Sequence, residues 1–374
     1  MFQKEKLNLN IIIPIIILAV ISVITIHSAS VYISDSLGNL ALKQSMWYIA
    51  GIILIFFIIK LKNDFFYQYV WVFYIIGNLS LLSLLFFAPR INQARIWFVI
   101  PGIGSVQPSE FIKVFLMVLL AVMIHKFKVQ HKYPTIKEEF IFLVKTLIVV
   151  LIPSLLTFLQ PDTGIVIIYF VTYLCMLFLS GIRLRWFIFF TSFLLFILFI
   201  VIYLYHFHEN TFINIFGNDL FYRFERIFSW SSGVGIQLEN SVAAIGSAGI
   251  IGHGFNQTPI YFPEAGTDFI FAVFASNFGL LGILFFLFVI VYFNIQLLLL
   301  IRKKIAFRDR YLLAGILGML IFQQVQNIAM TVGLLPIMGI TLPFISYGGS
   351  SLLSYLFMIG LVLNISIQKE SLYQ

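Results

Sequence analysis

A sharp boundary between polar and apolar sequence lies in the stretch Tyr261-Phe262-Pro263-Glu264-Ala265-Gly266-Thr267-Asp268-Phe269-Ile270-Phe271. The stretch ends the one long polar segment of the chain and opens an uncharged run that continues to Ile301. Asp268 is the last charged residue before that run. Because a helix needs roughly 20 apolar residues to cross a bilayer, the run predicts a transmembrane helix that begins beside a polar loop.

Two roles suit Asp268 at this position. A carboxyl group between low-dielectric surroundings and water has a raised pKa, and such a group can act as a general base. An acidic residue at a helix start also acts as an N-cap or orients the helix, and that structural role alone would explain one isolated aspartate. The surrounding sequence has to decide between the two roles.

The composition identifies the class of protein. Of the 374 residues, 61% are hydrophobic and 10% are charged, whereas soluble domains carry about 25% charged residues. The mean hydropathy is +1.03. These values predict an all-α polytopic membrane protein, with residues 1–374 forming a single integral membrane domain. The lone Cys175 lies in an apolar run, so the sequence offers no disulfide framework and no thiolate metal site.

Long apolar stretches mark the membrane spans. They cover residues 7–34, 44–59, 65–89, 107–124, 140–160, 163–182, 186–208 and 269–301. The uncharged stretch 311–368 is too long for one helix, and its Gly- and Pro-rich part 333–349 divides it in two. The sequence therefore predicts about ten transmembrane helices. The first is longer than the apolar core of a signal peptide, so we expect a retained anchor.

Lys and Arg residues are distributed unequally between the two ends of these spans. With a cytoplasmic N-terminus, the cytoplasmic segments hold Lys4, Lys6, Lys60, Lys62, Lys126, Lys128, Lys132, Lys137, Arg183, Arg185, Arg302, Lys303, Lys304, Arg308, Arg310 and Lys369. The outer segments hold Lys43, Arg90, Arg95, Arg223 and Arg226. This asymmetry predicts that both termini are cytoplasmic and that one large extracellular loop covers about 209–267. Anionic lipid headgroups account for the net charge of +8, and no nucleic-acid partner is needed.

Ionisable residues lie at the outer ends of two other spans. Glu110 and Lys113 follow Pro108, which suits the first position of a helix, and their spacing places them on one helix face. They either neutralise each other or line a functional cavity. We expect Lys113 to lie inside an outer cavity embedded in the membrane, in contrast to Lys43. Asp162, in the turn after Pro161, either shapes that turn or contributes to the site.

The long polar loop carries three further features. Between residues 212 and 230, aromatic residues alternate with Arg223 and Arg226, which predicts a helix in the membrane interface. Its arginines bind lipid headgroups in general or one lipid's pyrophosphate in particular. Gln237 then precedes the glycine-rich run Gly246–Gly254, which follows no strand and so is not a dinucleotide fingerprint. Its glycines permit close backbone approach to a ligand, or only tight turns.

The last outer segment, residues 333–351, is rich in Gly, Pro, Ser and Thr. Irregular backbone persists near membrane depth only where it lines a cavity or packs inside protein. Hydroxyl groups such as those of Ser346 and Ser350 are candidates to hydrogen-bond a sugar. A purely structural re-entrant turn is the alternative.

Several of these segments resemble the signatures of the SEDS family (shape, elongation, division and sporulation), whose members include RodA, FtsW and SpoVE. The segments are Gln107–Lys113, Pro161–Gly164, Gly246–Phe271 and Asn327–Ser351, and the run Leu342-Pro343-Phe344-Ile345-Ser346-Tyr347-Gly348-Gly349-Ser350-Ser351 is highly specific. The resemblance covers the whole set of helices and is greatest to a RodA-type member. Three positions depart from the family pattern: Met338, Thr341 and Ala248.

The resemblance implies a bacterial peptidoglycan glycosyltransferase of the plasma membrane. Family members polymerise lipid II at the outer face and work with a class B penicillin-binding protein. The essential aspartate of the family's Pro-Glu-x-x-Thr-Asp-Phe segment corresponds to Asp268, the lysine of its Gln-Pro-Ser-Glu-x-x-Lys segment to Lys113, and the aspartate of its Pro-Asp-x-Gly turn to Asp162.

These correspondences imply roles in an inverting glycosyl transfer. Asp268 is the expected base. The candidates to bind substrate are Lys113, Glu110, Arg95, Asp162, Arg223, Arg226, Gln237, Glu264, Ser346 and Ser350. A divalent cation, Mg²⁺ or Mn²⁺, is a candidate cofactor beside the pyrophosphate, although the sequence shows no dedicated set of metal ligands.

Two other functions suit parts of the same pattern. A transporter that flips lipid II would use Glu110, Lys113 and Asp162 along its path. A non-catalytic scaffold for other cell-wall enzymes would not need Asp268. The location of the polar residues on the outer face, and the lack of an evident inverted repeat in the sequence, favour the enzyme.

Overall fold

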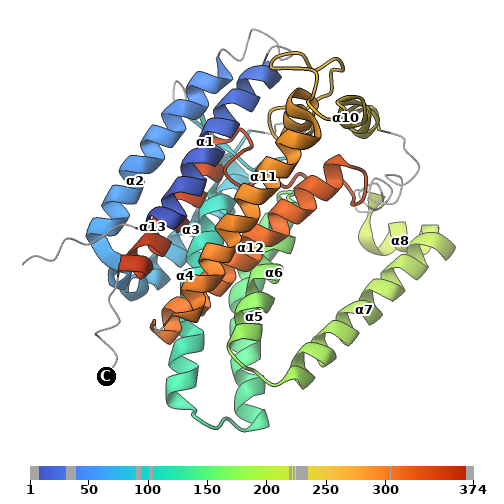
Figure 1. The fold of residues 1–374 in the computed structure, drawn as a ribbon. Helices are drawn as coiled ribbons and strands as arrows, with labels where there is room; N and C mark the ends of the chain where they lie inside the picture. The colour runs from blue at the N-terminus through green and yellow to red at the C-terminus, as the bar shows by residue number, and fades with distance from the viewer. Residues whose placement is uncertain are drawn as a thin grey trace, which may run out of the picture.

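The structure is a computed structural model that describes residues 8–30, 39–89, 94–100, 104–218, 221, 224, 235–303 and 305–367. Its helices are α1 (Leu9–Ser30), α2 (Leu40–Gln68), α3 (Val70–Phe87), α4 (Pro108–Gln130), α5 (Ile136–Leu159), α6 (Thr163–Leu179), α7 (Leu184–Phe207), α8 (Glu209–Phe216), α10 (Ile236–Ser247), α11 (Ile270–Arg302), α12 (Phe307–Thr331) and α13 (Gly349–Ile367). The long helices other than α7 run side by side through one bundle, with the short helix α10 at one end and α8 following α7 (Figure 1).

The predicted fold class is confirmed. Among the described residues, eight helices are long and apolar enough to cross a membrane. Helix α4, which carries four charged residues, and the shorter apolar helix α6 are not among these eight, yet both pack within the bundle and bring the number close to the predicted ten. Most boundaries agree with the apolar stretches to within four residues, but α3 begins five residues later than predicted, α4 ends six residues later, and α2 is longer than its stretch at both ends. Helix α2 continues past Ile59 with an interruption at Lys62, which has a φ of 61°, and Asn63 beyond the interruption donates a hydrogen bond to Leu361 O at 3.0 Å.

The helices differ greatly in how deeply they are buried. Helix α13 packs against α2 and α4, and 83% of the residues in its apolar 18-residue stretch are buried. Helix α12 packs against α4 and α6, and α1 against α2 and α11. Helix α7 leans away from the bundle (Figure 1), and no residue in its apolar 18-residue stretch is buried. The centre of the bundle is therefore formed by helices from both ends of the sequence.

The glycine-rich run 246–254 joins the backbone of α11. Helix α11 is interrupted at Gly279, which has a φ of 59°, and the freed backbone groups pair with the run. His253 N donates to Ser276 O at 2.9 Å, and Leu280 N donates to Gly249 O at 3.0 Å. A Cβ atom at Gly279 would lie 2.3 Å from Gly252 N, so both positions require glycine. The close approach that these glycines permit is to the helix.

The irregular segment between α12 and α13 packs inside protein. Ser22 of α1 donates to Ile345 O at 2.7 Å, and Gln44 of α2 donates to Ser346 O at 3.3 Å. The Tyr48 hydroxyl donates a hydrogen bond to the carbonyl oxygen of Phe344, the residue before Ile345. Side chains of the first two helices thus satisfy a backbone that has no regular structure, as membrane depth requires.

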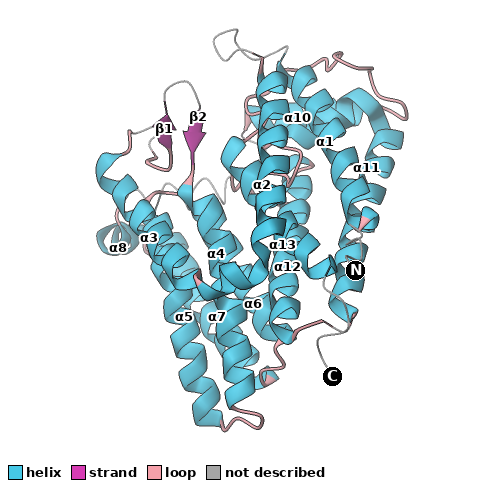
Figure 2. Cartoon of the chain, turned by 90° about the vertical axis from the view of Figure 1, so that its left-hand side faces the viewer, coloured by secondary structure: helices cyan, strands magenta, loops and turns pink. Residues whose placement is uncertain are grey.

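A small hairpin lies at the same end of the bundle. Strands β1 (Phe98–Ile100) and β2 (Gly104–Val106) pair antiparallel between α3 and α4 (Figure 2). Ser350, near the start of α13, accepts a hydrogen bond from Gln107 N at 2.9 Å and donates one to Ser105 O at 3.2 Å. The hairpin is therefore fastened to the central helix.

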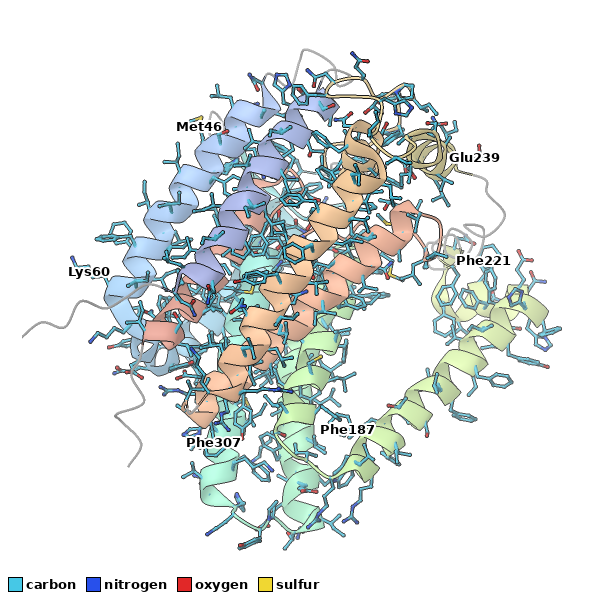
Figure 3. All side chains as sticks on the ribbon, viewed as in Figure 1. Met46, Lys60, Phe187, Phe221, Glu239 and Phe307 are labelled. Atoms are coloured by element: carbon cyan, nitrogen blue, oxygen red, sulfur yellow. The ribbon has the colours of Figure 1, made fainter. Side chains whose placement is uncertain are left out.

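Basic residues gather at the other end of the bundle. The described Lys and Arg residues at the α2–α3, α4–α5, α6–α7 and α11–α12 connections are Lys60, Lys62, Lys126, Lys128, Lys132, Lys137, Arg183, Arg185, Arg302, Lys303, Arg308 and Arg310. Met46 and Lys60 mark the two ends of α2, with Lys60 on the basic side (Figure 3). The cytoplasmic location of this end, and of both termini, stays a prediction from the Lys and Arg asymmetry.

Candidate functional site

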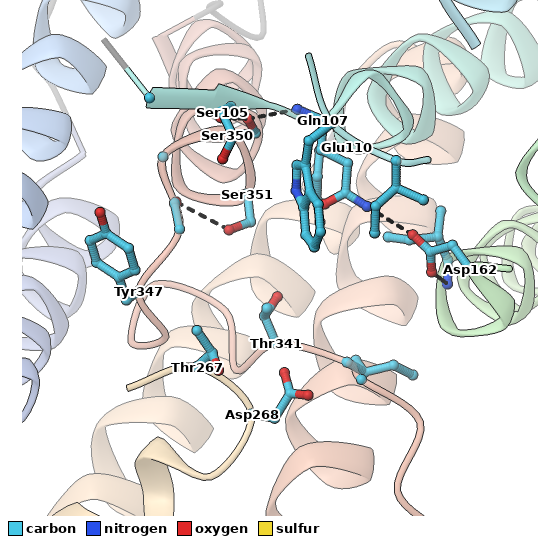
Figure 4. Close-up of a pocket in the computed structure, with 18 of the residues that line it drawn as sticks. Ser105, Gln107, Glu110, Asp162, Thr267, Asp268, Thr341, Tyr347, Ser350 and Ser351 are labelled. Carbon is cyan, nitrogen blue, oxygen red and sulfur yellow. Dashed lines mark hydrogen bonds between the residues drawn. The ribbon is translucent and has the colours of Figure 1, made fainter. Parts of the chain in front are cut away.

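A cavity of about 1210 Å³ opens at the end of the bundle that carries the hairpin. Its walls come from the first turns of α2, the hairpin, the starts of α4 and α6, the loop before α11, Gln323 of α12, the segment before α13 and the start of α13. The polar residues that line it are Lys43, Ser105, Gln107, Glu110, Asp162, Thr163, Glu264, Thr267, Asp268, Gln323, Thr341, Tyr347, Ser350 and Ser351. Figure 4 shows most of these side chains converging on one space.

Asp268 lines this cavity, and its backbone is held by hydrogen bonds from distant residues. Asn327 donates to Asp268 O at 2.8 Å, and Ser346 donates to Thr267 O at 2.6 Å. Tyr347 N donates to Gly266 O at 2.8 Å. Segments separated by more than fifty residues thus fix the position of one carboxylate.

The carboxyl group of Asp268 is only partly exposed, and no hydrogen bond reaches it from the described residues. It faces the cavity beside Thr341 (Figure 4). Burial, with smaller contributions from the negative charges of Glu264 and Asp162, raises the pKa of Asp268 to about 7. A carboxylate with such a pKa accepts a proton readily at neutral pH, which suits a general base.

Asp162 lies on another wall of the same cavity. Its side chain caps α6 by accepting from Ile165 N at 3.2 Å, and it accepts from Gln107 Nε2 at 2.8 Å. Burial raises the pKa of Asp162 to about 7, opposed by these two hydrogen bonds. The structure therefore combines both roles that the sequence left open, because the residue forms the cap and also lines the cavity.

Glu110 and Lys113 form a buried ion pair. Lys113 is 1% exposed, and its ammonium lies 4.2 Å from the centroid of the Tyr355 ring. The Tyr355 hydroxyl pairs with Thr341 Oγ1 at 3.1 Å and accepts from Gln323 Nε2 at 2.9 Å. Through Tyr355, the ion pair thus packs behind Thr341 and Gln323, two residues that line the cavity.

The expectation that Lys113 lies inside the cavity while Lys43 does not is wrong. Lys43 lines the cavity, whereas Lys113 lies beneath its surface and only Glu110 of the pair reaches the lining. Spacing along α4 predicted the pairing correctly. It did not reveal that Tyr355, contributed by α13, covers the lysine.

The other predicted residues lie in different places. Glu264 and Ser350 line the cavity, whereas Ser346 is buried behind it and uses its hydroxyl on the backbone of Thr267. Arg95 donates to Leu85 O at 2.6 Å and is not among the lining residues. Gln237 lies on α10, also away from the lining. Arg223 and Arg226 lie outside the described residues.

Several lining residues were absent from the predicted set. Gln107 connects Asp162 to the hairpin, and its place directly before Pro108 marked it as the residue that precedes α4. Trp47 and Thr341 also line the cavity. No periodicity distinguishes these two from ordinary apolar or loop residues, so the sequence carried no usable signal for them.

A metal ion has no ready set of ligands within the described ranges. No three His, Cys, Asp or Glu side chains gather there closely enough to hold one. The carboxylates of Asp268 and Asp162 belong to different walls, as Figure 4 shows. The candidate Mg²⁺ or Mn²⁺ stays a prediction.

Comparison with known proteins identifies the family. The model of the FtsW, RodA and SpoVE family, described as cell cycle proteins, matches residues 8–371. The chain belongs to this family. It is the SEDS family that the motifs resemble, and its members share the membrane fold seen here.

Relatives and solved structures agree with this assignment. The chain is 32% identical to the probable peptidoglycan glycosyltransferase FtsW of Buchnera aphidicola over 90% of this chain and 87% of that protein. It is 30% identical to the stage V sporulation protein E of Bacillus subtilis over 97% and 98% of the two chains.

The fold matches the rod shape determining protein RodA of Thermus thermophilus with a TM-score of 0.68 and 24% identity, covering 96% of each chain. It matches a chain of a peptidoglycan synthase complex, described as coordinating polymerisation and crosslinking, with a TM-score of 0.77 and 23% identity over 96% and 97% of the two chains. The protein is a multi-pass protein of the bacterial plasma membrane.

Proposed function

We propose that this protein is a peptidoglycan glycosyltransferase that polymerises lipid II at the outer face of the plasma membrane. The observation that carries the proposal is Asp268, a partly exposed carboxylate of raised pKa in a large polar cavity. The relatives named as glycosyltransferases at 32% identity support the same activity.

The reaction requires one proton transfer and one exchange of bonds at carbon. The 4-hydroxyl of the N-acetylglucosamine of one lipid II attacks C1 of the lipid-linked growing strand. A new C1–O bond forms as the bond from C1 to the pyrophosphate oxygen breaks, and undecaprenyl pyrophosphate leaves with both electrons of that bond. Attack from the face opposite the leaving group inverts the configuration at C1. Asp268 takes the hydroxyl proton, and its pKa of about 7 suits that role.

The surroundings of Asp268 hold it in position without neutralising it. Asn327 and Ser346 bind the backbone at Asp268 and Thr267, so their hydrogen bonds leave the carboxylate itself available. Lys113, a buried cation of the same end of the bundle, is paired with Glu110. A base that keeps its negative charge and a defined orientation needs this separation of roles.

The location of the cavity favours an enzyme over a flippase. The cavity lies at the hairpin end, and its lining comes from loops and helix ends of that end. A transport path would have to continue toward the basic end. The acids of that end are engaged in local pairs, such as Asp64 with Arg308 at 2.7 Å. A non-catalytic scaffold would have no use for an unpaired carboxylate in a polar cavity.

The cellular role and the partner are also part of the proposal. A class B penicillin-binding protein is the proposed transpeptidase partner, supported by the similarity to a complex that couples polymerisation with crosslinking. A role in elongation, as in RodA-type members, or in division follows from the family. The outer location of the cavity is supported by the basic residues at the opposite end.

The direct test is reconstitution. The purified protein, alone and with its cognate transpeptidase, is incubated with lipid II, and the products are separated by size. We expect glycan polymer that depends on this chain and is greater with the partner. Movement of labelled lipid II across a vesicle membrane without any polymer would instead support the flippase.

A further inference from the structure

A single lysine interrupts the membrane-facing surface of α5. Lys145 is the one charged residue between Phe140 and Leu159, inside a stretch whose apolar length predicts a membrane span. Its side chain is exposed, and so are those of Ile141 and Ile148, which share its helix face. A charged residue among exposed apolar side chains is costly in a bilayer, so its presence indicates a function.

The described part of the chain offers this lysine no partner. No hydrogen bond and no ion pair reaches the Lys145 ammonium from the described residues. The two acids of α5 are engaged near the start of the helix. Glu138 accepts from Thr135 N at 2.7 Å and completes the N-terminal cap. Glu139 is buried and accepts from Trp186 Nε1 at 2.9 Å. The counter-charge of Lys145 must therefore come from outside these residues.

Lys145 lies on the edge of α5 that borders α3. The two helices pack against each other (Figure 2), and the Tyr74 hydroxyl of α3 donates to Val149 O of α5 at 2.9 Å. Nearer the hairpin end, Gln160 Nε2 donates to Leu81 O at 2.7 Å. Both bonds join the helices in the same order, so α3 and α5 run parallel. Lys145 precedes Val149 by four residues and therefore shares its helix face, one turn nearer the basic end.

The adjoining surface of α3 carries an exposed tryptophan near this level. Trp71 is 48% exposed, and its ring lies 5.8 Å from that of Tyr74 in an edge-to-face contact. It precedes Tyr74 by three residues, so it also lies about one turn nearer the basic end than the hydrogen bond to Val149. Tryptophan is enriched where the hydrocarbon of a membrane meets the headgroups. Trp71 therefore indicates that the boundary of the hydrocarbon lies close to the level of Lys145.

The starts of the two helices agree with a boundary at this level. Helix α3 begins at Val70, whereas α5 begins at Ile136, nine residues before Lys145. The first turns of α5 thus extend past the boundary, and they carry the exposed Lys137. The Cα–Cβ bonds of a helix tilt toward its N-terminus, which for α5 is the basic end, and a lysine stem can lie along apolar surface while its ammonium reaches the headgroups.

We propose that Lys145 and the surface between α3 and α5 beside Trp71 bind an anionic phospholipid of the leaflet at the basic end. The Lys145 ammonium donates charge-assisted hydrogen bonds to the phosphate oxygens. The exposed Ile148 and Ile152, on the hairpin side of the lysine, contact the acyl chains. The site lies on the outside of the bundle and shares no residue with the lining of the cavity, so it does not depend on the proposed function.

Native mass spectrometry of the purified protein in detergent tests the proposal without turnover. Wild-type protein, Lys145→Met and Lys145→Arg are titrated with phosphatidylglycerol, and with phosphatidylcholine of the same acyl chains, whose headgroup has no net charge. We expect Lys145→Met to bind the first phosphatidylglycerol about fivefold more weakly, the loss expected for one lysine near an anionic headgroup. Lys145→Arg should bind nearly like the wild type because it keeps the charge. Phosphatidylcholine should bind all three proteins equally.

Lys60→Met is the matched control, because Lys60 is an exposed lysine in the apolar part of another helix, α2, at the same end of the bundle (Figure 3). It should bind phosphatidylglycerol like the wild type. Thermal unfolding gives a second measurement, because a ligand that binds the native state raises the melting temperature. Phosphatidylglycerol should raise that of the wild type and of Lys60→Met more than that of Lys145→Met. Without added lipid the three proteins should melt alike.

Equal affinity of the wild type and Lys145→Met for phosphatidylglycerol would overturn the proposal. An equal loss in Lys60→Met would also overturn it, because the loss would then reflect net charge and no particular site. Glycerol 3-phosphate at the same concentration should not displace the lipid, since it lacks acyl chains. Displacement would assign the site to a free phosphate ester. Weaker binding of the transpeptidase by Lys145→Met, with unchanged lipid affinity, would assign the lysine to an acid of a partner helix.

Discussion

One acidic residue of the hairpin end differs from the buried acids of the basic end. At the basic end, Asp309 accepts from the Tyr67 hydroxyl at 2.5 Å, and Glu139 accepts from Trp186 Nε1 at 2.9 Å. Both carboxylates are buried and engaged with side chains of neighbouring helices. At the hairpin end, Asp268 faces a cavity with no hydrogen bond to its carboxylate from the described residues. Acids that stabilise a fold are paired, whereas an acid left unpaired at a cost to stability indicates a function.

The largest expected effect comes from removing the unpaired acid. Asp268→Asn keeps the shape of the side chain and loses the proton acceptor, so the rate of glycan synthesis should fall by about 100- to 10,000-fold. The variant should insert stably and still bind its transpeptidase and lipid II. Polymerisation of lipid II by the purified variant measures the rate. Glu264→Gln is the control, because its side chain accepts from Thr267 Oγ1 at 2.6 Å, and the amide oxygen can do the same.

A near-normal rate for Asp268→Asn would show that the unpaired carboxylate at the hairpin end is not the base of the reaction. A variant that only failed to insert would assign Asp268 to orienting α11.

The buried pair at the hairpin end should behave as a structural element despite its closeness to the cavity. Lys113→Ala leaves the Glu110 carboxylate buried without its partner, which typically costs about 3–5 kcal/mol. We expect a large fall in the melting temperature of the purified protein together with loss of activity. The double variant Glu110→Gln with Lys113→Met removes both charges and should recover most of the thermal stability. If the single variant melted like the wild type, Lys113 would not be held as the structure indicates.

At the basic end, removal of an acid should affect stability and spare the chemistry. Glu139→Ala leaves the Trp186 indole N–H without its acceptor, at a cost of about 1–3 kcal/mol, and removes the carboxylate that lies 3.7 Å from Arg183 Nη1. The melting temperature should fall, while the polymerisation rate per folded molecule stays at the wild-type level. A loss of rate in protein that is still fully folded would mean that this end also contributes to catalysis.

The smallest expected effect is a change of pH dependence. A base acts in its deprotonated form, so with the pKa of Asp268 at about 7 the polymerisation rate should rise through neutral pH and fall about tenfold per unit below it. The negative charge of Asp162 contributes to raising the pKa of Asp268, so Asp162→Asn should move this limb to lower pH. Asparagine caps helices as well as aspartate, so α6 should persist. An unchanged limb, or a shift to higher pH, would contradict the coupling between the two acids.

Much of the fold was predictable because hydrophobic length and Lys and Arg asymmetry are properties of the sequence itself. The apolar stretches located the spans, and the polar motifs located Asp268, Asp162 and Glu110, which do meet in one cavity. These residues lie at span boundaries, where a change from polar to apolar sequence is directly visible.

The remainder depends on contacts between distant segments. Ser346 was predicted to bind sugar, but its hydroxyl donates to Thr267 O, 79 residues away in the chain. Lys113 was predicted to line the cavity and Lys43 was not, but the structure shows the reverse. Helix spacing tells which residues share a face and not which neighbouring helix covers that face. Only packing, here of Tyr355 over Lys113, decides which of two lysines meets the cavity.

The order of synthesis gives the central position of α13 a further meaning. A ribosome releases residues 349–367 after every other element of the bundle has been made, yet Ser350 fastens the hairpin and the residues just before α13 form part of the cavity wall. Until α13 is made, the earlier helices therefore lack the helix that packs between α2 and α4. A chain stopped before residue 349 would carry Asp268 and every other acidic residue of the cavity without the completed cavity, so we expect such an unfinished molecule to make no glycan.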